Sequence, residues 1–274
     1  MSLPPPSPRR GQPPGGPPPH RRRGRSLVVG AVLLASVLAL AACGSGDPPA
    51  PPAALGNTVD LSVPPSIAGL RLVDQNGRPT DLAAFRGRVL LLAPFLTSCQ
   101  EVCPITTGAL LAVESALRAD HLGGQVAVAE LTVDPDRDQP ARLAAFQALS
   151  GSTWPLLTAE PATLASFWHH FGIYYQKVPE AQPAGIDWQT GRPYTYDVDH
   201  FDGFMVFDRS GRERFLTGGM PDLAGRLDPR LRALLDSEGR QNLAHPGPAR
   251  PWTVSDALGA VAYVLGRPVP PAHA

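Results

Sequence analysis

Apolar residues recur with two different periods along the middle of the chain, and these periods predict alternating strands and helices. Continuous apolar runs at 88–96 and 126–133 are typical of strands that are covered on both faces of a sheet. Residues 104–118 and 141–149 repeat apolar positions at helical spacing, with Pro104 in a first turn, where its missing N–H is tolerated. We therefore expect a β-α-β-α unit at the centre of the fold.

Antiparallel hairpins are predicted on both sides of this unit. Residues 70–73 and 80–82 flank Asn76-Gly77, a dipeptide that readily adopts the positive φ of a tight turn. A second strand-turn-strand pattern spans 204–216. Further helices are expected at 164–170, 231–235 and 254–265. This order predicts an α/β, thioredoxin-like fold with a central mixed sheet flanked by helices and an N-terminal hairpin.

Two stretches follow neither period. We expect residues 177–198 and 237–252 to be irregular insertions. Asp136 and Asp138 stand just before the helix at 141–149, and we expect them to cap its N-terminus. With Asp134 they lack the spacing and the glycine of a calcium-binding loop.

The first 42 residues have the pattern of an export signal. A Pro-, Gly- and Arg-rich stretch precedes the apolar run 27–42, which is shorter than the roughly 20 residues of a membrane-spanning helix. The run ends in Leu40-Ala41-Ala42-Cys43, which resembles a bacterial lipobox. We therefore expect removal of residues 1–42 as a lipoprotein-type signal peptide and lipidation of Cys43. An uncleaved transmembrane anchor is the alternative, and both Sec and Tat export are left open.

Either alternative places the protein outside the cytoplasm, anchored to the cell membrane. Residues 43–66 form an expected Pro/Ala/Gly-rich tether, 67–266 the thioredoxin-like domain and 267–274 a disordered tail. The chain carries 24 basic and 24 acidic residues, and six of the arginines lie in the leader, so the exported domain is acidic. This charge balance, with no basic run in the domain, excludes a nucleic-acid partner.

Two cysteines are left to act as a pair once Cys43 carries lipid. Cys99 and Cys103 lie four positions apart, between the strand at 88–96 and the helix at 104–118. If the loop is helical, they share one face with about 6 Å of rise between them, which suits both a soft metal ion and a disulfide. A helix N-terminus also lowers the pKa of a nearby thiol.

Three segments together carry a family resemblance. The cysteine pair with Pro104, Thr132-Val133-Asp134-Pro135-Asp136-Arg137-Asp138, and Tyr196-Asp197-Val198-Asp199-His200 resemble the Sco/SenC family of copper-binding thioredoxin-like proteins over about residues 66–236. The resemblance implies that Cys99, Cys103 and His200 bind copper. It also implies a metallochaperone that helps to assemble the dinuclear copper centre of cytochrome c oxidase, with the copper-bearing oxidase subunit or another copper protein as its partner.

The residues agree with this interpretation in their chemistry. Two thiolates and an imidazole suit Cu(I) and also make Cu(II) accessible, whereas zinc would be one ligand short of a closed site. Asp199 is expected either to orient the imidazole or to be a solvated carboxylate. Leu96-Thr97-Ser98 and Phe201 depart from the family's usual residues. We expect these departures to change the hydrogen bonds around the ligands and hence the redox potential of the copper site. A thiol–disulfide oxidoreductase using the same two cysteines is the alternative function.

Overall fold

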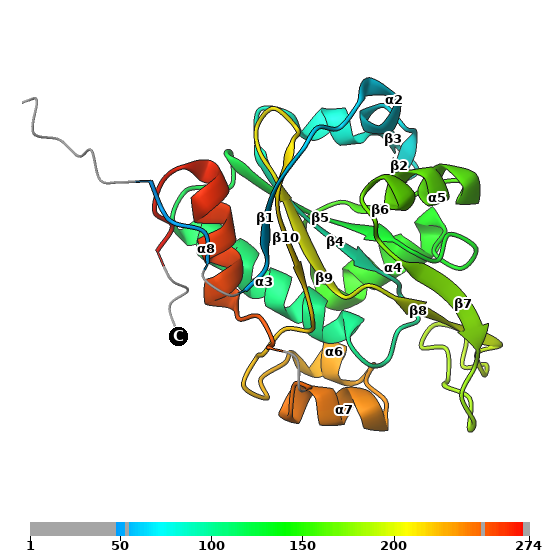
Figure 1. The fold of residues 1–274 in the computed structure, drawn as a ribbon. Coiled ribbons are helices and arrows are strands. Elements are labelled where there is room, and N and C mark those ends of the chain that lie inside the picture. The colour runs from blue at the N-terminus through cyan, green and yellow to red at the C-terminus, as the bar shows by residue number, and fades with distance from the viewer. Residues whose placement is uncertain (1–47, 53–54, 248–249, 271–274) are drawn as a thin grey trace, which may run out of the picture. The chain divides into compact units, whose positions relative to one another are not determined.

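An eight-stranded sheet occupies the centre of the computed structural model, which describes residues 48–52, 55–247 and 250–270 (Figure 1). Cys43 and the expected signal peptide 1–42 lie outside the described residues. In chain order the elements are β1 (Asn57–Leu61), α2 (Pro65–Ala68), β2 (Leu72–Asp74), β3 (Pro79–Thr80), a 3₁₀ turn (Leu82–Phe85), β4 (Val89–Phe95), α3 (Cys103–Ala119), β5 (Val126–Thr132), α4 (Pro140–Ser150), β6 (Leu156–Thr158), α5 (Pro161–His170), β7 (Tyr175–Pro179), β8 (Tyr196–His200), β9 (Gly203–Phe207), β10 (Glu213–Gly218), α6 (Pro229–Arg232), α7 (Ser237–Ala244) and α8 (Val254–Leu265).

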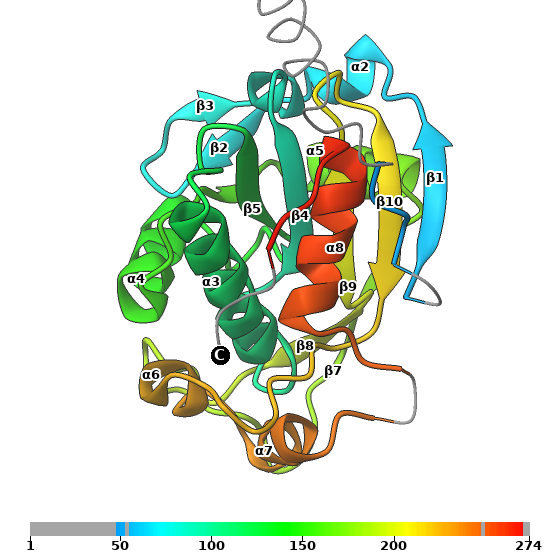
Figure 2. The same cartoon turned by 90° about the vertical axis from the view of Figure 1, so that its left-hand side faces the viewer.

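The strand order β1-β10-β9-β4-β5-β6-β2-β3 confirms the predicted thioredoxin-like α/β fold. Strands β4, β5 and β6 are parallel, and β9 and β10 continue the sheet antiparallel beside β4. Helices α3 and α8 lie over one face of the sheet, and α5 lies over the other (Figures 1 and 2). Every residue of β4 and β5 is buried, as a strand covered on both faces requires. The N-terminal hairpin β2–β3 is also present, with Leu72 opposite Thr80.

Three sequence-based expectations about the chain outside this core were wrong. Strand β1 and the first two residues of helix α2 lie in the stretch 43–66 expected to be a tether, and β1 pairs with β10 at the edge of the sheet. The hydroxyl of Thr217 donates to the backbone oxygen of Leu55 at 2.5 Å, which ties this stretch to the sheet. The two expected irregular insertions contain parts of the β7–β8 hairpin and all of α7. These elements are short, so few apolar positions mark them in the sequence.

The expected cap of α4 was also wrong. Gln139 occupies the position before the helix, and its side chain makes no capping hydrogen bond. Asp138 is fully buried and accepts hydrogen bonds from the hydroxyls of Thr97 (2.5 Å) and Thr132 (2.6 Å). Its carboxylate is used for a tertiary contact with the cysteine-bearing loop and is therefore not free to cap α4.

Strand β4 loses its pairing with β9 near its carboxyl end, which leads to the two cysteines. Pairing between β4 and β9 runs from Leu90 to Leu92 and then stops, while pairing with β5 continues to Phe95. Pro94 lies beyond the last β9 pair, so its missing N–H leaves no gap in that ladder. The chain then leaves the sheet and enters the loop before α3.

Candidate metal centre

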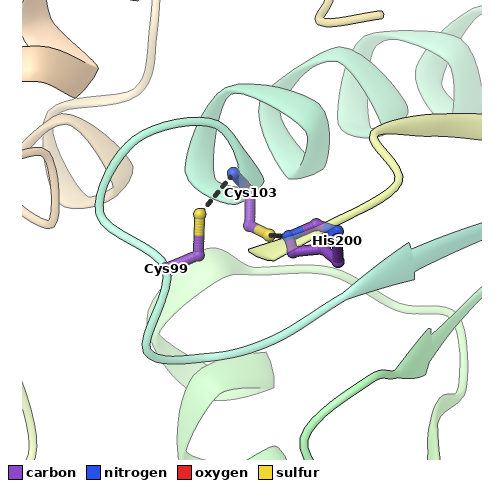
Figure 3. A group of neighbouring side chains, drawn as sticks. All are labelled: Cys99, Cys103 and His200. Atoms are coloured by element: carbon purple, nitrogen blue, oxygen red, sulfur yellow. Dashed lines mark hydrogen bonds between the residues drawn. The ribbon is translucent and has the colours of Figure 1, made fainter. Parts of the chain in front are cut away.

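Cys99, Cys103 and His200 come together from two parts of the chain that are about a hundred residues apart (Figure 3). Cys99 lies in the loop after β4, Cys103 begins α3, and His200 ends β8. Their sulfur and ring nitrogen atoms all lie within 4.8 Å of one another. The Sγ of Cys103 is 3.7 Å from Nε2 of His200. Three donor atoms that a soft metal ion favours therefore converge at one point.

The site is enclosed. Cys99 is 8% exposed, Cys103 is 2% exposed, and the His200 side chain is 5% exposed. Both thiols are free. Charge interactions between groups removed from water in this way are much stronger than at a surface.

The sulfur of Cys99 takes the place of a helix cap. No side chain caps α3 at Val102, and instead the backbone N–H groups of Val102 and Cys103 donate to Cys99 Sγ at 3.4 and 3.3 Å. The neighbouring Cys103 thiol and the His200 ring further stabilise the anion of this sulfur, which places the pKa of Cys99 well below its usual range in spite of burial. Burial and the neighbouring Cys99 raise the pKa of Cys103. Cys99 is thus the more readily deprotonated thiol of the pair.

His200 presents the correct nitrogen to the sulfurs. Its Nδ1 lies 2.9 Å from the backbone oxygen of Phe201, and because a carbonyl oxygen only accepts, Nδ1 carries the hydrogen. In the neutral ring, Nε2 then has a free lone pair facing Cys103. Burial alone would lower the pKa of His200, but the Cys99 sulfur and the Asp202 carboxylate raise it to about 9.

A different carboxylate from the expected one faces the imidazole. Asp199 is exposed on β8, opposite Gln176. Asp202 places its Oδ1 3.8 Å from Nδ1 of His200. Of the two alternatives for Asp199, the structure favours the solvated carboxylate. Neighbours in an extended strand point to opposite sides, so the residue next to His200 is poorly placed to touch its ring.

Sequence reasoning missed Glu101, which lies in the loop between the cysteines. Its Oε2 is 3.4 Å from Cys99 Sγ and accepts the backbone N–H of Gln100 at 3.1 Å. Burial, followed by the negative charges of Cys99 and Asp197, raises its pKa to about 9. The position of Glu101 between the two cysteines was the only sequence signal that could have identified it.

Sequence reasoning also missed a set of side chains that holds Thr97, two residues before Cys99. The backbone N–H of Thr97 donates to Asp138 at 3.1 Å, and its backbone oxygen accepts the indole N–H of Trp188 at 2.8 Å. Its hydroxyl accepts from Arg142 Nε at 2.5 Å, and Arg142 is also paired with Asp187 at 2.8 Å. Every polar group of Thr97 thus has a partner at least 41 residues away.

Fold and site together define a thioredoxin-fold protein with two cysteines and a histidine grouped at the first helix after a central strand. Comparison with known proteins identifies its family. The SCO1/SenC family profile matches residues 65–220, which is more than half of the chain. The chain belongs to the SCO1/SenC family.

The chain is also similar to individual proteins. The chain is 31% identical over 143 residues to the SCO1 protein homolog of Bacillus subtilis, a match that covers 51% of this chain and 71% of that protein. It is 29% identical over 140 residues to the mitochondrial SCO2 homolog of Mus musculus and covers about half of each chain (51%). Among solved structures, it is similar to Bradyrhizobium japonicum ScoI with copper bound, at 24% identity and a TM-score of 0.46, over 66% of this chain and 96% of that one.

Within the described residues, no helix combines the length and the apolar character that crossing a membrane requires.

Proposed function

We propose that this protein is a copper metallochaperone that binds one copper ion through Cys99, Cys103 and His200. It passes that ion on during assembly of the copper centre of cytochrome c oxidase. The observation that carries the proposal is the convergence of two sulfurs and Nε2 of one imidazole within 4.8 Å. Membership of the SCO1/SenC family supports copper as the metal, and the residues that the family profile matches, 65–220, include all three.

The donor set fits copper as cargo. Thiolates favour Cu(I), and an imidazole makes Cu(II) accessible, so both oxidation states have a suitable ligand here. The pKa values of Cys103 and His200 are both raised, so these two groups hold protons that a bound cation would displace, whereas the lowered pKa of Cys99 favours its thiolate. Copper uptake is therefore expected to release protons.

Substitution of the histidine tests the site. We expect His200→Ala to weaken copper binding strongly and to change the copper spectrum, because it removes one of three donors. His169→Ala is the matched control, since His169 is an exposed histidine on α5. Copper stoichiometry and affinity would be measured by competition with a chelator. If His200→Ala bound copper as the parent does, the three-residue site would be wrong.

The partner proposed for transfer is the copper-bearing subunit of cytochrome c oxidase. Its test is to mix the copper-loaded protein with the metal-free domain of that subunit and follow the absorption of the dinuclear centre. Formation of that spectrum with the parent, and its loss with His200→Ala, is expected. Failure of the loaded parent to deliver copper would contradict the chaperone role while leaving the metal site intact.

A thiol–disulfide oxidoreductase is the second candidate, favoured by the unequal pKa values of the two cysteines. The Cys99 thiolate would attack a partner disulfide and release one partner thiolate. The Cys103 thiol, on losing its proton, would then attack the sulfur of Cys99 and release the second. Two electrons pass to the partner, and Cys99 and Cys103 become a disulfide. Cys103→Ser would trap the mixed disulfide if this activity exists, and His200→Ala would leave it largely intact.

Membrane attachment is proposed to occur through a lipid on Cys43. The lipobox-like sequence Leu40-Ala41-Ala42-Cys43 supports it. The expected result is that the parent fractionates with membranes and that Cys43→Ser yields an unlipidated protein by mass spectrometry. A lipid-free parent of full length in the membrane fraction would instead favour an uncleaved anchor.

A further inference from the structure

The segment 221–245, here called the α6–α7 segment, packs against the loop between the two cysteines. It follows the residues that the family profile matches. Two hydrogen bonds join it to Gln100, the residue after Cys99. The backbone N–H of Asp236 donates to the Gln100 backbone oxygen at 3.2 Å, and the Gln100 side-chain amide donates to the backbone oxygen of Leu234 at 3.4 Å. The segment therefore holds both the backbone and the side chain of this loop residue.

Gly239 brings helix α7 directly onto the loop. A Cβ atom at this position would overlap the backbone oxygen of Gln100 and would lie 2.9 Å from Cδ2 of Leu235. Glycine inside a helix is about 1 kcal/mol less favourable than alanine, so Gly239 does not help α7 itself to form. The missing side chain is what allows the helix to touch the loop.

The same segment also contacts the other end of the cysteine loop. Ile105, two residues after Cys103, is fully buried in a small apolar cluster with Leu235 and Leu243. Leu223 and Leu227 pack against that cluster. One continuous segment thus fixes the chain just after Cys99 and just after Cys103.

We infer that the α6–α7 segment is a brace that holds the cysteine loop in its metal-binding shape, with Gly239 and Gln100 as positioning residues. Only three residues separate the cysteines, so a shift of Gln100 is passed directly to Cys99 and alters its distance from Cys103 and His200. Fixing donor atoms before the metal arrives reduces the ordering that binding requires, which raises affinity. The choice of copper as ligand rests on the proposed function, whereas the restraint of the metal-free thiols does not.

Gly239→Ala tests the brace, with Gly247→Ala as its control. Gly247 follows the same helix, has no atom within 4 Å of a Cβ position, and does not require a positive φ. We expect Gly239→Ala to weaken copper binding about tenfold or more, as loss of a supporting contact typically does, and to shift the thiolate-to-Cu(II) charge-transfer band. Gly247→Ala should leave both unchanged. The band reports donor geometry, so a variant that only lost global stability would not shift it while folded.

Two further measurements keep the test decisive. Gln100→Ala retains Gly239 and removes the side-chain hydrogen bonds to Leu234 in the segment and to Ile186 in the β7–β8 loop, each 3.4 Å long. It is expected to act in the same direction if Gly239→Ala does not fold. Alkylation of the thiols in the metal-free protein should be several-fold faster in Gly239→Ala or Gln100→Ala than in Gly247→Ala. If the parent failed to bind copper, the proposed function would be wrong, and the alkylation rates alone would test whether the α6–α7 segment restrains the cysteine loop. If affinity, spectrum and alkylation in both variants equalled those of Gly247→Ala, the brace would be wrong.

Discussion

Residues 89–119, here called the β4–α3 arm, contain strand β4, the cysteine loop and helix α3. This arm and the two segments that pack on the cysteine loop contribute to the same site by different physical means. The arm is buried through a continuous apolar strand and a helix with an apolar face. The β7–β8 loop, residues 180–195, and the α6–α7 segment reach the site through contacts that follow no sequence period. These include the hydrogen bonds from Trp188 to Thr97 and from Asp236 to Gln100, and the small apolar cluster around Ile105. The arm supplies the two cysteines, and the two segments hold the residues beside them.

The difference shows which parts of a metal site a sequence pattern reveals. Burial against a sheet imposes a period of two or of 3.6 on apolar residues, and that period is visible in the arm. A hydrogen bond between residues 91 positions apart imposes no period at all. The supporting residues of the site are therefore invisible until the chain is folded.

The largest expected loss of stability lies in the arm. Leu91 is fully buried at the centre of β4, so Leu91→Ala is expected to lower the free energy of unfolding by about 3 kcal/mol, through lost burial and the cavity left behind. Guanidinium unfolding measures this. Leu216→Ala, at a half-buried position on β10, is the control and should lose clearly less. Equal losses at the two positions would mean that the arm does not dominate the stability of the core.

A second prediction concerns a buried carboxyl group in the arm's partner strand. Glu130 on β5 has no exposed surface and accepts hydrogen bonds from Thr107 (2.8 Å) and Trp154 (2.9 Å). Burial raises its pKa to about 7, against 4.5 for an ordinary glutamate. Between these two pH values the folded protein keeps a proton that the unfolded chain releases. The free energy of unfolding therefore falls as pH rises from 4.5 to 7.

Glu130→Gln removes this titration. The stability of the parent relative to Glu130→Gln is expected to fall by about 3 kcal/mol between pH 4.5 and 7, and to be constant at higher pH. Denaturant unfolding at several pH values measures the difference. Glu160→Gln, at an exposed position, should stay parallel to the parent. A difference that stayed constant from pH 4.5 to 8 would contradict the raised pKa.

The sequence was sufficient for the core of the fold and insufficient for the surroundings of the metal site. Apolar periodicity placed α3 and α8 to within one residue at each end. The metal-site residues came from a family resemblance, because nothing in the spacing of Cys103 and His200 shows that they meet. Asp202, Glu101 and Trp188 were missed, since each acts through a contact that depends on how a loop turns.

The third prediction compares two tryptophans that each donate one indole hydrogen bond to a backbone oxygen. Trp188 donates to Thr97 beside the cysteines, and Trp252 donates to Gly219, in a different part of the fold (2.7 Å). Each change to Phe removes one hydrogen bond, worth about 1 kcal/mol of stability. Trp252→Phe is expected to lose more than this, because Trp252 is fully buried and the smaller ring leaves a cavity. Only Trp188→Phe should also weaken copper binding, by about tenfold, as loss of a supporting contact does. Equal copper affinities in the two variants would show that Thr97 does not transmit its position to Cys99.

The smallest expected effect belongs to one of two aspartates that have the same predicted role in the sequence. Asp136 and Asp138 were both expected at the start of α4, yet Asp138 is fully buried on Thr97 and Thr132, and Asp136 is an exposed partner of Lys177. Exposed ion pairs contribute little because water screens them, so Asp136→Asn should change the free energy of unfolding by less than about 0.5 kcal/mol.

Asp138→Asn replaces one acceptor oxygen by a donor among groups that already donate, and it should lose about 2 kcal/mol or more. Thermal or denaturant unfolding of the two variants side by side measures the contrast. Comparable losses would mean that the pair to Lys177 stabilises the β7–β8 hairpin more than its exposure allows. The supporting contacts of the site would then extend to its surface, where burial would no longer identify them.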